Sequence, residues 1–230
     1  RSYNAKNNRN ISNNLFIHGL STRHVRNSRQ MYGGRIKSLE DFVMVVPNVV
    51  STDLCLETVK ELQDSSWLKH DFVQYNNDVD KSYQKSPCET IITHGTDNDD
   101  IPQSELIMKE VWNAIYMYLM QHGKPHFTGW TGFTQPKWNR YKTGTNMEQH
   151  VDHIDSIFNN DWGVPKGIPI LSIVGLLNDD FEGGEFVMFG HRKAELKAGD
   201  VLIFPSNFAW PHEVKTVTKG TRYSFISWVY

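Results

Sequence analysis

Cysteine is scarce in this 230-residue chain, and long hydrophobic runs are absent from it. Cys55 and Cys88 are the only cysteines, which is too few for a secreted disulfide scaffold or for a zinc site built on cysteines. We therefore expect a reducing, cytoplasmic location. No apolar run approaches the roughly 18 residues that a transmembrane helix needs, so we expect no membrane partner.

Acidic residues are missing from the first 38 positions, which contain eight Lys and Arg residues. The rest of the chain holds 16 basic and all 26 acidic residues, so it carries a net charge of −10. A basic arm of this kind can contact nucleic acid or can fold back on an acidic body. Because the arm lacks the aromatic interleaving of single-strand binders, we interpret residues 1–38 as a basic, polar extension. Nucleic acid stays open as the less favoured partner.

Hydrophobic residues make up 39% of the chain, enough for one packed domain over residues 39–230. Apolar spacing predicts helices at 52–63 and 104–120. Short segments separated by Gly, Pro and Asp turns predict strands at 42–50, 127–142, 147–153, 169–177, 184–189, 192–196, 200–204, 211–217 and 222–229. This order predicts a mainly β protein with supporting helices, built on a double-stranded β-helix (jelly roll, cupin-like).

A polar, turn-rich segment at residues 76–89 lies between two possible strands. Its composition predicts a mobile loop that could cover a substrate, with an ordinary hairpin turn as the alternative.

His150 and Asp152 lie two residues apart in a predicted strand, so alternation places both side chains on one face. A histidine from a distant strand would complete two imidazoles and one carboxylate, a set that holds iron(II) and leaves three coordination positions open. The pair is weak by itself, because His153 and Asp155 repeat the same spacing.

The residues downstream strengthen this interpretation. His212 begins a predicted strand, and Arg222 follows ten residues later, after Gly220. The planar guanidinium of an inward-facing arginine needs an anionic partner and suits a carboxylate. That partner is either a bound dicarboxylate or an internal Asp or Glu.

Four ordered motifs within residues 39–230 resemble the 2-oxoglutarate/iron(II)-dependent oxygenases. They are YKTGTNMEQHVD (141–152), LLNDDFEGGEFVMF (176–189), AGDVLIFPSN (198–207) and PHEV…GTRYSFISW (211–228). Their spacing is similar to the prolyl 4-hydroxylase branch and to its oxygen-sensing members, and it selects His150 rather than His153. Met147 departs from the aromatic residue that is frequent there, and Leu176 from a carboxylate-binding tyrosine.

The resemblance implies an enzyme that hydroxylates a substrate carbon, with a prolyl residue of a protein or peptide as the first choice. It uses O2 and releases succinate and CO2, with ascorbate as a further cofactor. The implied iron ligands are His150, Asp152 and His212. The implied 2-oxoglutarate site consists of Arg222, Tyr141, Ser224 and Trp228.

Three alternatives stay open: a free amino acid as substrate, a modified nucleobase as substrate, and a jelly-roll binding module without catalysis. Trp228 stands where nucleobase demethylases of this fold tend to have a second arginine, which argues against the nucleobase. A binding module would leave Arg222 and Tyr141 without a role.

Overall fold

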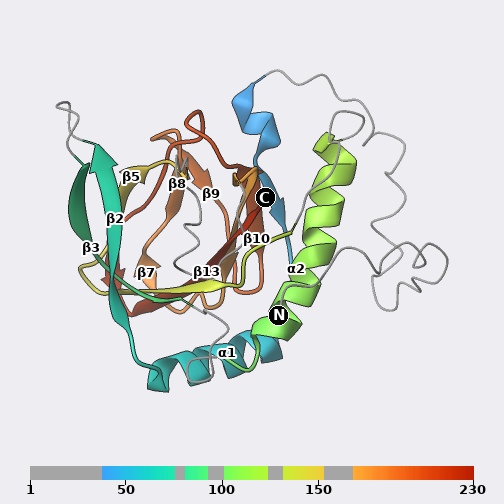
Figure 1. Cartoon of the computed structure of the whole chain (residues 1–230). Coiled ribbons are helices and arrows are strands. Elements are labelled where there is room, and N and C mark those ends of the chain that lie inside the picture. Colours follow the sequence, from blue (N-terminus) through green and yellow to red (C-terminus); the bar gives the residue numbers. More distant parts are fainter. Residues whose placement is uncertain (1–37, 76–80, 93–100, 124–131, 153–167) are drawn as a thin grey trace.

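The computed structural model describes residues 38–75, 81–92, 101–123, 132–152 and 168–230. These residues form a seven-stranded and a four-stranded antiparallel sheet, a two-stranded ribbon and two α-helices (Figure 1). The predicted class, a mainly β double-stranded β-helix with supporting helices, is confirmed. No helix in the described part of the chain is long and apolar enough to cross a membrane.

The larger sheet has the strand order β1-β10-β6-β13-β4-β3-β2. Its members are β1 (Met44–Val46), β2 (Leu68–Tyr75), β3 (Lys81–Ile92), β4 (Lys137–Lys142), β6 (Leu171–Leu176), β10 (Val201–Pro205) and β13 (Thr221–Val229). The strand β13 lies in the middle, between β6 and β4. Its register with β4 pairs Arg222 with Tyr141 and Ser224 with Asn139.

The smaller sheet has the order β5-β11-β8-β9. It contains β5 (Met147–His150), β8 (Phe186–Met188), β9 (Arg192–Ala194) and β11 (His212–Val214), while β7 (Glu182–Gly183) and β12 (Val217–Lys219) form the ribbon. Within this sheet His212 is the register partner of His150.

A hydrophobic core fills the space between the two sheets. Tyr141, Leu202 and Phe204 of the larger sheet pack there with Phe186 and Met188 of the smaller one. We call the side of the larger sheet that carries these residues its inner face. Because side chains alternate along a strand, Arg222, Ser224, Ile226 and Trp228 of β13 also lie on this face.

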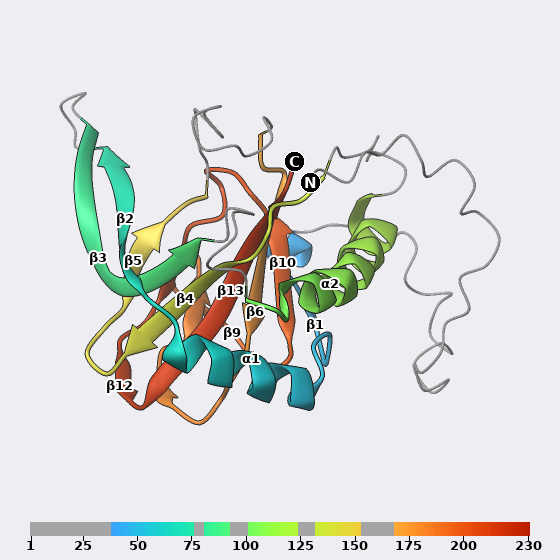
Figure 2. The ribbon, with the colours of Figure 1, turned by 60° about the horizontal axis from the view of Figure 1, so that its bottom comes forward.

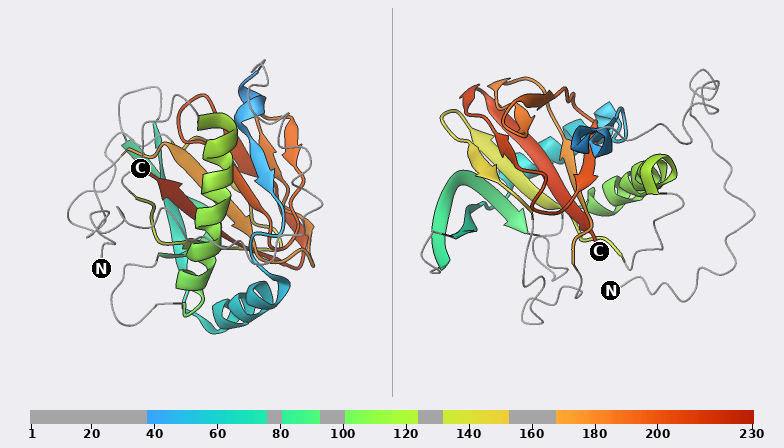
Figure 3. Two further views of the ribbon diagram at one scale, coloured as in Figure 1. Left: turned by 90° about the vertical axis from the view of Figure 1, so that its right-hand side faces the viewer. Right: turned by 90° about the horizontal axis from the view of Figure 1, so that it is seen from above.

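A second core lies on the outer face, beneath α1 (Thr52–Asp64) and α2 (Ser104–Tyr118). Figures 2 and 3 show both helices on this side of the sheet. The α1 helix begins at Ser51, whose hydroxyl accepts a hydrogen bond from the Leu54 amide at 3.3 Å. The apolar stripe of α2 is buried against the sheet, where Trp138 and Phe225 are fully covered.

Both predicted helices are present, with ends within two residues of the predicted ones. The strand predicted at 42–50 is wrong in extent, because it contracts to Met44–Val46. Of the strand predicted at 127–142, residues 127–131 lie outside the described residues, and the described part holds a strand at Lys137–Lys142. The strand β2 was expected only as a possible strand before residue 76, without bounds.

The loop predicted at residues 76–89 is wrong for its greater part, because residues 81–89 belong to β3. Pairing with β2 makes this polar segment a strand despite its composition, and β4 pairs with the continuation of β3 from Glu89 to Ile92. Residues 76–80, the basic arm up to residue 37 and the second pair, His153 and Asp155, lie outside the described residues.

Candidate metal centre and anion site

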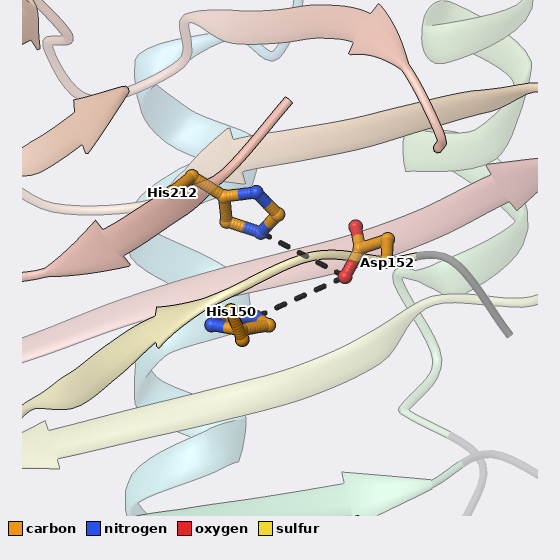
Figure 4. A group of neighbouring side chains, drawn as sticks. All are labelled: His150, Asp152 and His212. Atoms are coloured by element: carbon orange, nitrogen blue, oxygen red, sulfur yellow. Dashed lines mark ion pairs between the residues drawn. The ribbon is translucent and has the colours of Figure 1, made fainter. Parts of the chain in front are cut away.

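Three side chains with metal-binding atoms converge at the edge of the inner face. His150 ends β5 and His212 begins β11, so their register pairing brings the two imidazoles together, with ring centroids 4.4 Å apart. Asp152 follows β5 by two residues and presents its carboxylate to both rings (Figure 4). Among the residues that the structure describes, no other cluster of three His, Cys, Asp or Glu side chains could hold a metal ion.

The spacing of the donor atoms fits a single ion. Oδ1 of Asp152 lies 3.8 Å from Nε2 of His150 and 3.7 Å from Nε2 of His212. All three donor atoms lie within 4.8 Å of one another. Ligands that bind one ion at about 2.1 Å and at right angles lie roughly 3 Å apart, so small side-chain movements close the set.

Both imidazoles are held in the tautomer that metal binding requires. Nδ1 of His150 lies 2.8 Å from the Glu148 carbonyl oxygen, and Nδ1 of His212 lies 3.0 Å from that of Trp210. Because a carbonyl oxygen only accepts, each Nδ1 carries the proton and donates. Each Nε2 therefore keeps its lone pair and directs it towards Asp152.

The carboxylate of Asp152 is oriented from behind. Its Oδ2 accepts hydrogen bonds from the Ser172 hydroxyl at 2.7 Å and from the Trp228 indole at 3.2 Å, which leaves Oδ1 for a cation. Burial by itself would raise the pKa of Asp152, but the two histidines and these hydrogen bonds outweigh it and hold the pKa below its ordinary value. Asp152 is therefore an anionic ligand at neutral pH.

His212 is the most enclosed of the three and is 3% exposed. The Phe186 ring stacks on it at 5.2 Å, and the Phe204 ring meets it edge-on at 5.0 Å. Burial lowers the pKa of His212 to about 4, with Asp152 opposing this effect. A neutral imidazole is the form that coordinates a metal.

A buried arginine lies farther along the inner face. Arg222 is 2% exposed, donates a hydrogen bond from Nη1 to the Ser224 hydroxyl at 2.7 Å, and has its guanidinium 5.2 Å from the centre of the Tyr141 ring. Burial lowers the pKa of Arg222, with Tyr141 opposing this effect. No Asp or Glu in the described part of the chain forms an ion pair with Arg222. The internal-carboxylate alternative therefore has no support among these residues.

Burial also raises the pKa of the Tyr141 hydroxyl, which keeps it a neutral hydrogen-bond donor. Leu176, the register partner of Ser224, gives this part of the inner face an apolar wall. Guanidinium, phenol and hydroxyl together form a site for the end of a carboxylic acid.

Sequence reasoning missed two residues of this face, Asn139 and Lys137. They precede Tyr141 by two and four positions on β4, so counting back along the same alternation finds both. Asn139 is 4% exposed, and its side-chain oxygen has no hydrogen-bond partner among the described residues. A buried, unsatisfied amide of this kind is costly and points to a missing ligand group.

Residues 136–230 match the family model of the 2OG-Fe(II) oxygenase superfamily. A PKHD-type hydroxylase of Acinetobacter baumannii is 27% identical over 193 residues, covering 80% of this chain and 76% of that protein. Another from Idiomarina loihiensis is 40% identical over 94 residues, covering 40% of this chain and 39% of that protein.

Solved structures share the fold at low identity. A Pseudomonas putida prolyl-4-hydroxylase matches with a TM-score of 0.54 and 18% identity, over 82% of this chain and 91% of that one. A Trichoplax adhaerens prolyl hydroxylase, in complex with a hypoxia inducible factor peptide fragment, matches with a TM-score of 0.57 and 18% identity, over 82% of this chain and 83% of that one.

Proposed function

We propose that this chain, a member of the 2-oxoglutarate/iron(II)-dependent oxygenase superfamily, hydroxylates a prolyl residue of a protein or peptide. It is an oxidoreductase, a dioxygenase with iron(II) as metal and 2-oxoglutarate as cosubstrate. One observation carries the site assignment. The strand β13 carries Trp228, which supports Asp152, and Arg222 on the same face. Arg222 has no carboxylate partner among the described residues.

We assign His150, Asp152 and His212 as the iron ligands, because two neutral imidazoles and one carboxylate suit this metal and leave room for other ligands. The iron supplies O2 activation coupled to the decarboxylation of 2-oxoglutarate to succinate and CO2. The protein fixes the donors: backbone carbonyls set both tautomers, and Ser172 and Trp228 hold the carboxylate.

We assign Arg222 to the far carboxylate of 2-oxoglutarate, with help from Tyr141 and Ser224. The guanidinium is fixed in place before the ligand arrives, since Ser224 accepts one of its hydrogen bonds and Tyr141 lies against it. Pre-organisation of this kind lowers the entropy cost of binding. Trp228 lines the metal end of the site.

The prolyl assignment has support from the relatives. The curated relatives are named PKHD-type hydroxylases, and solved structures of the same fold include prolyl hydroxylases, one of them with a peptide bound. Trp228 occupies the position of the second arginine of nucleobase demethylases, which favours a peptide over a nucleobase. Ascorbate would keep the iron ferrous.

We assign residues 39–230 to the catalytic domain and residues 1–38 to an extension of it. Cys55 and Cys88 are both buried and do not form a disulfide, which supports a reducing, cytoplasmic location.

The test is succinate formation by the full chain supplied with iron(II), 2-oxoglutarate, O2 and ascorbate, followed by mass spectrometry of proline-containing peptides. We expect succinate and a peptide heavier by one oxygen atom. Oxygen transfer to free proline or to a nucleoside instead of a peptide would overturn the substrate assignment. Absence of succinate with every substrate would overturn the enzyme assignment.

A further inference from the structure

Lys137 places a second positive charge on the inner face. It alternates with Asn139 and Tyr141 on β4, and it is the register partner of Ile226 on β13. Trp228, two residues beyond Ile226, donates to Asp152. Lys137 therefore lies within about 7 Å, measured along the strand, of the position that supports the metal centre.

The partner of Lys137 is a histidine rather than an acid. Its Nζ lies 2.9 Å from Nδ1 of His70 on β2. An ammonium group only donates, so Nδ1 of His70 accepts and this imidazole is neutral. No Asp or Glu in the described part of the chain forms an ion pair with Lys137, and burial lowers the pKa of its ammonium to about 8, with Cys88 and Asp152 opposing this effect.

A partly buried cation without a counter-ion is unfavourable, and natural chains tolerate such groups mainly at functional sites. The charges of the loaded site point the same way. When iron(II) and the doubly negative 2-oxoglutarate are bound, their charges cancel. The charges of Asp152, Arg222 and Lys137 then add up to one net positive charge. One additional carboxylate would neutralise it.

We propose that Lys137, positioned by His70, binds a carboxylate of the substrate, so that the preferred prolyl substrate carries an acidic group close to the proline. This inference rests on the proposed function and adds a substrate class to it. Lys137 is a specificity residue in this scheme, and His70 is a positioning residue.

The alternative source of the carboxylate is 2-oxoglutarate itself. In the proposed site, the far carboxylate of 2-oxoglutarate is bound by Arg222 and its near carboxylate by the metal. Both carboxylates of the cosubstrate are thus already committed, which favours the substrate as the source.

The test uses an equimolar pool of end-blocked Ala-Xaa-Pro-Xaa-Ala peptides in which Xaa is Asp, Asn, Glu or Gln. The full-length protein with iron(II) and 2-oxoglutarate is incubated with the pool without O2, and the retained peptides are identified by mass spectrometry. The same pool is then followed for hydroxylation in the presence of O2. We expect acidic peptides to be enriched at least about tenfold over their amide counterparts.

Lys137→Met should abolish this enrichment and leave the 2-oxoglutarate requirement unchanged, while Lys137→Arg should keep part of it. Lys142→Met is the matched control, because Lys142 is exposed on the same strand and pairs with Glu89. Lys137→Met should also melt at a higher temperature than the unaltered protein, since it removes an uncompensated cation.

Enrichment that is absent from the unaltered protein, or that persists in Lys137→Met, would overturn the proposal. A raised 2-oxoglutarate requirement in Lys137→Met, with enrichment intact, would assign the lysine to the cosubstrate and so also overturn it. Failure of the proposed function has a different signature, namely no succinate from the unaltered protein. The retention experiment needs no turnover and still reports on Lys137 in that case.

Discussion

His150 and His212 face each other as register partners across β5 and β11, with their ring centroids 4.4 Å apart. The pairing of two short strands, 62 positions apart in the chain, thus sets the distance between two metal donors. The metal centre should consequently depend on single side chains of this pair more than on the stability of the fold.

Replacing His212 with alanine should reduce iron(II) affinity by more than about 100-fold and abolish succinate formation, because it removes one of three donors. Calorimetric titration with iron(II) under anaerobic conditions measures the first effect. His191→Ala is the matched control, since His191 is exposed and, among the residues that the structure describes, contacts Glu40 and its own turn. Unchanged iron affinity in His212→Ala would remove His212 from the ligand set.

Replacing Ser172 with alanine should reduce iron affinity by about 10-fold to 100-fold, because Asp152 loses the 2.7 Å hydrogen bond that orients its carboxylate. Ser227→Ala provides the comparison. The Ser227 hydroxyl is also buried and donates to the Thr134 carbonyl at 2.8 Å, but it has no contact with Asp152. Equal losses in the two variants would mean that the effect is structural.

Replacing Arg222 with alanine should raise the apparent 2-oxoglutarate requirement about 100-fold and leave iron affinity nearly unchanged, because the far carboxylate of 2-oxoglutarate loses its buried charge partner. Steady-state succinate assays measure the 2-oxoglutarate requirement, and a separate titration measures the iron affinity. Arg140→Ala is the control, as Arg140 pairs with Glu89 on the outer side of the same sheet. An unaltered requirement would remove Arg222 from the cosubstrate site.

Gly184→Ala should weaken 2-oxoglutarate binding and lower stability by about 1–3 kcal/mol. Gly184 has φ +65°, and an added Cβ would lie 2.9 Å from Val217 Cγ2 and 3.1 Å from Arg222 Cδ. Gly144→Ala separates strain from contact, because Gly144 has φ +85° with nothing within 4 Å of an added Cβ. We expect Gly144→Ala to be destabilised but to keep its 2-oxoglutarate affinity. A loss of 2-oxoglutarate affinity in Gly144→Ala would contradict the explanation of the Gly184→Ala effect by contact with Arg222.

Glu89 should contribute to acid sensitivity. Burial by itself would raise the pKa of this carboxyl, but hydrogen bonds from Arg140 and Lys142 outweigh it and hold the pKa below its ordinary value. Its stabilising contribution is therefore present above the unfolded-state pKa of about 4 and is lost as pH falls through the folded-state value. In denaturant titrations, Glu89→Gln should be less stable than the unaltered protein at pH 7 and should approach it in acid. The exposed Glu57→Gln should follow the unaltered protein throughout.

Within each strand, the residues nominated from sequence share a face in the structure because their spacing is local information. His150 and Asp152 share a face by strand alternation, and Arg222 and Trp228 do so for the same reason. Asn139 and Lys137 obeyed the same rule and were missed, since neither residue type signals a site by itself. Their importance becomes visible only through an amide oxygen and a cation that lack a hydrogen-bond partner and a carboxylate partner, respectively, within the described part of the chain.

The strands β2 and β3 could not be found in the same way. Residues 81–88 are polar and turn-rich, and they belong to a strand because β2 pairs with this part of β3. The strand β4, some 50 positions away, pairs only with residues 89–92, and register across such a separation is a property of the whole fold. The same limit applies to the contact between Trp228 and Asp152, which depends on a 76-residue separation.

The strand β13 has a consequence for how this enzyme can diversify. Arg222 and Trp228 are six residues apart on it, about 20 Å, and one inserted or deleted residue between them would turn one of the two side chains to the opposite face. The spacing between the proposed cosubstrate anchor and the proposed metal support is thus protected from length variation, and only substitutions are tolerated there. New substrate preferences would have to arise on neighbouring elements, such as the edge strand β2 that carries His70.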